Sequence, residues 1–177
     1  MCIRDRYREA FIDYLENKIE VKEPKNLYEP MVYILGLGGK RLRPVLVLMA
    51  TEIFNKDYKE ALDAALAIEI FHNFSLVHDD IMDDAPLRRG KATVHEKWDV
   101  NTGILSGDAM LINAYQLFEN YEGDTFKELA QLFTKTAIEV CEGQQYDIDF
   151  ETRDDVSIDD YLCLLYTSPS PRDRTRS

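Results

Sequence analysis

The sequence predicts an all-α protein whose helices pack side by side as a bundle. Apolar residues recur every three or four positions along most of the chain, the spacing that places them on one face of a helix. No segment alternates apolar and polar residues over the length of a strand, and we find no internal repeat. The predicted helices span residues 7–20, 26–39, 43–54, 58–84, 101–121 and 125–151.

The first three predicted helices are short. Residues 7–20 and 26–39 both carry apolar positions at helical intervals, and the second segment ends in two glycines, a common helix stop. Residues 43–54 are strongly apolar and carry Pro44 near the start, where proline is tolerated because the first-turn N–H groups have no helical partner. The pattern therefore predicts three short helices before residue 55.

A longer helix is predicted at residues 58–84, which are rich in Ala, Leu, Glu and Ile. Pro86 follows and ends it, because proline cannot continue the helical hydrogen bonding. Residues 101–121 and 125–151 have the same periodicity and predict two further helices.

The composition excludes several classes of protein. A net charge of -12 over 177 residues argues against a general nucleic-acid binder, which needs a basic surface. No apolar run reaches the roughly 18 residues of a transmembrane segment, and the N-terminus lacks the apolar core of a secretory signal. Three widely spaced cysteines argue against a disulfide framework or a zinc site. We therefore expect a cytoplasmic protein.

Both ends of the chain differ from its middle. Helical periodicity stops after "VSIDDYL", Ser, Pro and Arg then dominate, and Arg-Asp-Arg occurs at both 4–6 and 172–174. We expect residues 1–6 and 166–177 to be non-native, similar to translated adaptor sequence, with residues 7–165 forming the N-terminal part of a domain. The alternative is a genuine disordered terminus, and the reading frame in the source DNA distinguishes the two.

The stretch "HNFSLVHDDIMDDAPLRRG", residues 72–90, places several acidic side chains at the end of the helix predicted at residues 58–84. Asp79 and Asp83 are four residues apart, so they share a face about 6 Å apart along the axis. Their repulsion, and the unfavourable helix dipole at this end, predict a cation that offsets both. Carboxylate oxygens are hard ligands, which favours Mg²⁺, Mn²⁺ or Ca²⁺.

Two alternatives bear on these aspartates. A solvated acidic helix end needs no metal. An EF-hand loop starting at Asp79 is excluded, because it requires Gly at position six and Glu at position twelve, where Asp84 and Gly90 stand.

Two cationic clusters accompany the acidic pair. Arg88 and Arg89 follow the predicted helix, and "GGKRLRP" holds Lys40, Arg41 and Arg43 beside two glycines. Arg forks bind phosphate oxygens, and glycines let the backbone approach a ligand. The second cluster is not a Walker loop, since that pattern needs Ser or Thr after the Lys. Either cluster alone could be solubilising charge, but together with the acidic pair they predict a diphosphate substrate held by metal and cations.

His72 lies seven residues before Asp79, on the same helix face about 10 Å away. It could be an ordinary core histidine, but its alignment favours a position facing the same cavity. The residues between them are mostly apolar or small, so a ligand with an anionic head and a hydrocarbon tail would fit.

The segments "GGKRLRP", "FHNFSLVHDDIMDDAPLRRGKATVH" and "EGQQYDIDFE" closely resemble the trans-isoprenyl diphosphate synthases, the farnesyl and geranylgeranyl diphosphate synthase family. The resemblance runs from about residue 7 to 162. It implies an isoprenoid-synthase-type helical bundle, truncated about midway, and a homodimer at full length. The implied reaction condenses an allylic diphosphate with isopentenyl diphosphate to a C15–C20 product, with Mg²⁺ or Mn²⁺ as cofactor.

The resemblance also implies roles for individual residues. Asp79 and Asp83 would bind Mg²⁺, Asp80 would support them, and Arg88 would contact the allylic diphosphate. Gln145 would lie near the allylic substrate. The residues expected to hold isopentenyl diphosphate are Lys40, Arg43, His72 and Arg89.

Product length is predicted from Phe74, five residues before Asp79 and about 7.5 Å deeper along the axis. The resemblance implies that a bulky aromatic side chain at this depth forms the floor of the product tunnel. The side chain of the neighbouring Ser75 is too small to block growth of the product. We therefore expect fifteen or twenty carbons, with twenty favoured. Ordinary core packing of Phe74 is the alternative.

The chain departs from the family pattern at its end, because the second aspartate-rich motif is missing, so we expect this fragment alone to be inactive. A terpene cyclase, a non-catalytic subunit of a heteromeric synthase and a plain helical interaction module are the rival readings. Isopentenyl diphosphate binding distinguishes a synthase from a cyclase, and the intact aspartate motif argues against a non-catalytic subunit.

Overall fold

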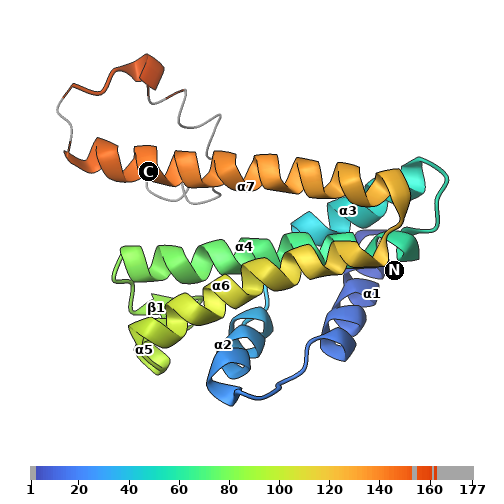
Figure 1. Cartoon of the computed structure of the whole chain (residues 1–177), viewed down its shortest axis with the longest axis horizontal. Helices are drawn as coiled ribbons and strands as arrows, with labels where there is room; N and C mark the ends of the chain where they lie inside the picture. Colours follow the sequence, from blue (N-terminus) through green and yellow to red (C-terminus); the bar gives the residue numbers. More distant parts are fainter. Residues whose placement is uncertain (1–2, 153–154, 161, 163–177) are drawn as a thin grey trace. The chain divides into compact units, whose positions relative to one another are not determined.

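Helices make up almost all the regular structure of residues 3–152, 155–160 and 162, the part of the chain that the computed structural model describes, and the all-α prediction is confirmed (Figure 1). The chain divides into two compact units, residues 1–122 and 123–177. The helices of the first unit are α1 (Ile3–Lys18), α2 (Lys25–Gly36), α3 (Leu42–Ile53), η1 (Tyr58–Ala61), α4 (Leu62–Met82), α5 (Val94–Lys97), α6 (Val100–Gln116) and η2 (Leu117–Asn120).

Helix α4 is the centre of the first unit. It contacts α1, α2, α3 and α6, so it is surrounded on most sides, and its residues are correspondingly apolar around most of its circumference. Ala65, Leu66 and Ile70 are at most 1% exposed. Three polar residues of the same helix, Glu69, Asn73 and Asp80, are also buried, and buried polar groups need partners inside the protein.

Helices α4 and α6 lie side by side (Figure 1), and glycines of α6 allow their close approach. A Cβ atom at Gly103 would lie 2.9 Å from Cδ1 of Ile81, and one at Gly107 would overlap the imidazole of His78. His78 also lies 3.2 Å from the carbonyl oxygen of Ile104. The end of α4 that carries the aspartates is therefore packed directly on α6.

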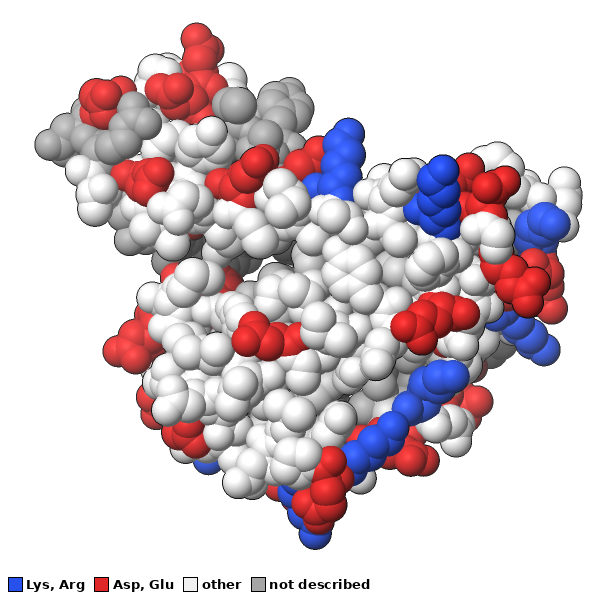
Figure 2. All heavy atoms as spheres, in the orientation of Figure 1, with Lys and Arg blue, Asp and Glu red and all other residues white. Residues whose placement is uncertain are grey.

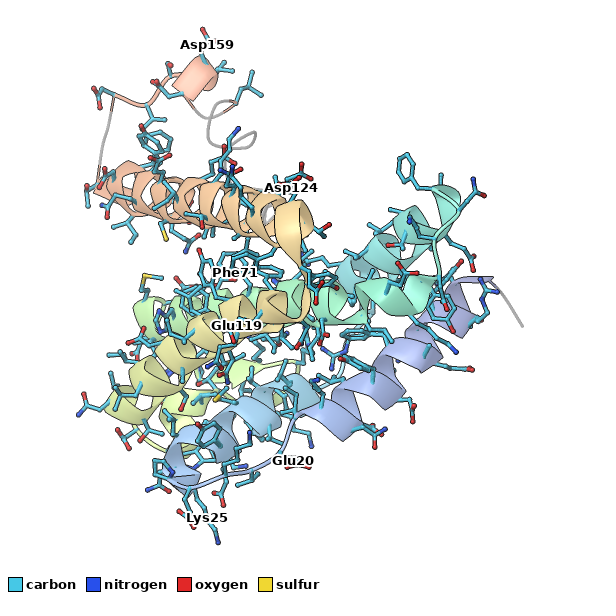
Figure 3. The ribbon with its side chains drawn as sticks, turned by 45° about the vertical axis from the view of Figure 1, so that its right-hand side comes forward. Glu20, Lys25, Phe71, Glu119, Asp124 and Asp159 are labelled. Carbon is cyan, nitrogen blue, oxygen red and sulfur yellow. The ribbon has the colours of Figure 1, made fainter. Side chains whose placement is uncertain are left out.

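Helix α1 contacts α3 and α4 through Tyr7, Phe11 and Leu15, which recur every four residues and are nearly inaccessible. It begins at Ile3, four residues before the predicted start, so it includes part of the segment expected to be non-native. In Figure 3 the labels Glu20 and Lys25 mark the link between α1 and α2. The other predicted terminal segment, residues 166–177, lies outside the described residues.

A small hairpin after α4 was not predicted. Strands β1 (Leu87–Arg88) and β2 (Lys91–Ala92) pair antiparallel, with Arg88 opposite Lys91. The two loop residues, Arg89 and Gly90, have φ of 54° and 76°, as a type I′ turn requires. Strands of two residues are too short to alternate detectably, so only Gly90 signalled the turn. The expectation of no strand is wrong at this point.

Two of the predicted helices are interrupted near one end. Residues 58–61 form the 3₁₀ turn η1 before α4, and residues 117–120 form η2 after α6. The side chain of Asp57 accepts a hydrogen bond from the N–H of Lys59, and this bond caps the start of η1.

The second unit contains α7 (Gly123–Thr152), within two residues of its predicted bounds. A helical turn at residues 158–160 begins with a capping box, in which the Ser157 N–H donates to Asp160 Oδ2 at 3.0 Å and Ser157 Oγ accepts from the Asp160 N–H at 3.1 Å. Asp160 thus has a local structural role. No helix of the described residues is long and apolar enough to cross a membrane.

Candidate active site

The acidic residues lie where α4 ends. Asp83 is the residue that follows the last turn, and its N–H donates to the carbonyl oxygen of Asp79 at 2.9 Å. The Asp79 side chain is 16% exposed and Asp83 is exposed, whereas Asp80 is 1% exposed. Asp79 and Asp83 therefore reach solvent from the same end of the helix, while Asp80 points into the protein.

Arg88 neutralises the buried aspartate. Its Nε donates to Oδ2 of Asp80 and its Nη2 donates to Oδ1, both at 2.6 Å, which is a bidentate pair. The same Nη2 lies 3.6 Å from Oδ2 of Asp79. The β hairpin is thereby fastened to α4, and Arg88 is held with its guanidinium beside the acidic pair.

Arg89 joins the two cationic clusters that are distant in sequence. Its Nη1 donates to the carbonyl oxygen of Gly38, which precedes α3. Gly39 has a φ of 139°, and a Cβ there would lie 3.2 Å from Nη1 of Arg89, so glycine is required both for the backbone and for the contact. The loop after α2 and the hairpin after α4 are therefore adjacent.

His72 has a lowered pKa. Burial is the main cause, and the charges of Arg43, Arg89, Arg88 and Arg41 add to it in decreasing order, so that together they lower the pKa from 6.5 to about 4. His72 is therefore neutral at pH 7, in a locally cationic region of an acidic protein.

The overall charge contrasts with this region. On the face of the molecule drawn in Figure 2, described Lys and Arg side chains stand singly among Asp and Glu. Lys40 is exposed and Arg43 is half-buried, and neither makes a hydrogen bond or ion pair with another described residue. Both cations remain available for an anionic ligand.

Arg41 differs from its neighbours in "GGKRLRP". It is buried, its Nη1 pairs with Oε1 of Glu69, and its Nη2 donates to the carbonyl oxygen of Leu35. Nδ2 of Asn73 donates to the carbonyl oxygen of Glu69 at 2.8 Å. Arg41 therefore holds the loop and is not a free phosphate ligand. The sequence reasoning missed Glu69 and Asn73, although two polar residues in an apolar helix could have signalled them.

Strained backbone concentrates in the same loops. Among the described residues, four non-glycine residues have positive φ, and three of them are Arg41, Asp84 and Arg89. A side chain in this region costs of order 1–2 kcal/mol, and such strain commonly accompanies functional sites. The loops keep it because ion pairs and hydrogen bonds hold Arg41 and Arg89 in place.

Phe74 lies on a different side of α4 from the acidic pair. Five residues correspond to 500° of helical rotation, which leaves Phe74 about 140° from Asp79. Its ring packs 4.8 Å from the ring of His78 and 5.6 Å from that of Phe71, labelled in Figure 3. Ser75 is nearer the Asp79 face, and its hydroxyl donates to the carbonyl oxygen of His72 at 2.8 Å.

Gln145 belongs to the second unit. It is exposed on α7, and its Nε2 donates to Oδ1 of Asp149 at 2.7 Å. Gln145, the residue expected near the allylic substrate, therefore bonds to a carboxylate one helical turn away.

Comparison with known proteins agrees with the sequence motifs. The polyprenyl synthetase family model matches residues 24–167. The geranylgeranyl diphosphate synthase of Methanosarcina mazei is 40% identical over 164 residues, which are 92% of this chain and 50% of that protein. The farnesyl diphosphate synthase of Bacillus subtilis is 38% identical over 117 residues, 62% of this chain and 40% of that protein.

Solved structures agree as well. A crystal structure of a geranylgeranyl pyrophosphate synthase has a TM-score of 0.91 and 58% identity, covering 94% of this chain and 51% of that one. The geranylgeranyl pyrophosphate synthetase of Geoglobus acetivorans has a TM-score of 0.88 at 37% identity, covering 94% and 55%. This chain spans about half the length of these relatives.

Proposed function

The chain belongs to the polyprenyl synthetase family, and we propose that the protein containing it is a cation-dependent prenyltransferase that condenses an allylic diphosphate with isopentenyl diphosphate. One observation carries the proposal beyond family membership. Arg88 pairs with Asp80 and lies 3.6 Å from Asp79, while its neighbour Arg89 donates to the Gly38 carbonyl oxygen. The two cationic segments therefore meet at the helix end that bears Asp79 and Asp83. Cations and carboxylates side by side suit a diphosphate and the metal ion that accompanies it.

The cationic side would bind the diphosphates directly. Lys40 and Arg43 have no ion-pair partner among the described residues, so phosphate oxygens can take that place. Arg88 uses Nε and Nη2 on Asp80, which leaves Nη1 for a phosphate oxygen. The role of Asp80 is then to orient Arg88, and a neutral His72 can donate a hydrogen bond without a charge of its own.

The acidic side fits Mg²⁺. Both oxygens of Asp80 accept from Arg88, so Asp79 and Asp83 are the residues of the motif that would hold the ion. Their oxygens are hard ligands, and two carboxylates plus substrate phosphates are the usual ligands of Mg²⁺. When bound, the ion would neutralise charge that develops on the leaving diphosphate.

The chain's own residues would promote ionisation of the allylic C–O bond. Arg88 is fixed by Asp80 before substrate arrives, so it would stabilise the leaving group without reorganising. Arg89, held by the Gly38 carbonyl oxygen, would bind isopentenyl diphosphate. The double bond of isopentenyl diphosphate would then attack the allylic cation, and loss of a proton gives the longer product. Relatives named as geranylgeranyl diphosphate synthases favour a product of twenty carbons.

The proposal is tested with a chimera that joins residues 1–162 to the second half of the Methanosarcina mazei relative. With Mg²⁺, it should incorporate labelled isopentenyl diphosphate into an allylic diphosphate. Asp79→Ala should lower turnover by a factor of at least 10³, whereas Asp13→Ala, which removes an exposed carboxylate from α1, should leave it unchanged. Turnover near the parent value in Asp79→Ala would refute the assignment.

A further inference from the structure

A second group of metal-ligand side chains lies beyond the aspartate motif. Ligand atoms of Asp84, His95 and Glu96 all lie within 4.8 Å of one another. Asp84 follows α4, while His95 and Glu96 belong to α5, which packs near the same end of α4 (Figure 1). The group shares no residue with the Asp79–Asp83 pair.

His95 supplies the independent observation. The residue is 8% exposed, and neither Nδ1 nor Nε2 has a hydrogen-bond partner among the described residues. A buried polar group without a partner is destabilising, and such groups are rare in native proteins. Nε2 lies 3.9 Å from Oε1 of Glu96, too far for a hydrogen bond. The imidazole therefore faces two carboxylates without bonding to either.

An ion between these groups would give the imidazole a partner. Imidazole nitrogen and carboxylate oxygen bind Zn²⁺ at about 2.0–2.2 Å, which places ligand atoms roughly 3.3 Å apart in a tetrahedral site. Asp84 and Glu96 are both exposed, so their side chains can move the remaining distance at little cost. A mixed nitrogen and oxygen set selects a divalent transition ion over the all-oxygen preference of Mg²⁺ and Ca²⁺.

We propose that Asp84, His95 and Glu96 form a site for a divalent transition-metal ion, with water as the remaining ligand. The site would link the two ends of the segment that carries the β hairpin, since Asp84 precedes the hairpin and His95 follows it. A bound ion would therefore restrain the hairpin that carries Arg88 and Arg89. It would add to the hydrogen bond that Thr93 Oγ1 donates to the Ala85 carbonyl oxygen at 2.8 Å.

The test uses the 177-residue chain with Asp79→Asn and Asp83→Asn, so that the proposed Mg²⁺ site is silent. Zn²⁺ binding is measured by calorimetry, and ¹⁵N-labelled histidine reports which ring is bound. We expect one equivalent of Zn²⁺ to bind and to shift the ring nitrogens of His95. Adding Glu96→Gln or Asp84→Asn should weaken binding at least tenfold, because each change removes one ligand of the ion. Both side chains are exposed, so neither change should disturb the fold.

Glu119→Gln, which removes an exposed carboxylate from η2, is the matched control and should bind Zn²⁺ as the parent does. The proposal is overturned if the parent binds no Zn²⁺, if the His95 ring is unaffected by the ion, or if binding is undiminished in both ligand variants. Failure here leaves the proposed prenyl transfer untouched, since that reaction depends on other residues.

Discussion

Replacing Glu69 by leucine should test how the loop before α3 is held. Glu69 and Arg41 form an ion pair whose side chains are 5% and 4% exposed. Glu69→Leu leaves the Arg41 charge buried without its carboxylate, and removing one partner of a buried pair costs roughly 3–5 kcal/mol. That is a large part of a typical stability of about 5–15 kcal/mol. For a chain of this size it corresponds to a fall in Tm of roughly 6–20 °C.

Denaturant and thermal unfolding of the parent and variants measure this effect. The double variant Arg41→Met/Glu69→Leu should recover much of the loss, because replacing both charges by apolar groups avoids the unpaired ion. Glu139→Gln is the control, since it breaks the exposed pair between Lys135 and Glu139 and should cost about 0.5 kcal/mol or less. A loss in Glu69→Leu no larger than in the control would refute the reasoning, as would a double variant less stable than Glu69→Leu.

Three further predictions concern α4 and its packing against α6. Gly107→Ala should destabilise the protein by roughly 1–3 kcal/mol because its Cβ would overlap His78, whereas Gly36→Ala, with nothing within 4 Å, should be nearly neutral in the same unfolding assay. Because the pKa of His72 is lowered in the folded protein, the unfolded chain takes up the proton at a higher pH than the folded chain does. The free energy of unfolding should therefore be at its full value above about pH 6.5 and fall by roughly 3 kcal/mol as the pH drops through 4. His72→Gln should remove this fall, and an unchanged pH profile in the variant would contradict the prediction. In the active chimera, Phe74→Ala should lengthen the product; an unchanged product with activity retained would mean that the tunnel floor lies elsewhere.

Phe74 shows what the number of residues between two positions can and cannot predict. Counting residues gave its depth along the helix, about 7.5 Å from Asp79, but depth ignores rotation about the axis. In the structure its ring packs with those of Phe71 and His78, and His78 adjoins α6. That environment is compatible with core packing, and the chimera experiment separates it from a role in product length.

Arg41 shows what a cluster of charged residues in the sequence can and cannot predict. Three cations in "GGKRLRP" predict an anion site, but the pattern contains no information on which side chain turns inward. Arg41 turns inward because Glu69, 28 positions later, offers it a buried partner. Lys40 and Arg43 have no such partner among the described residues, and their binding of an anion stays a prediction.

The sequence by itself determined the helical class, the helix bounds to within a few residues, and the acidic and basic segments of the site. These follow from periodicity and local charge, which act between residues close in the chain. Only the tertiary structure decided which groups meet: Arg88 with Asp80, Arg89 with the Gly38 carbonyl oxygen, and His95 with two carboxylates. Such pairings depend on how loops separated in sequence pack together, and ion pairs and hydrogen bonds form only where that packing brings the atoms within reach.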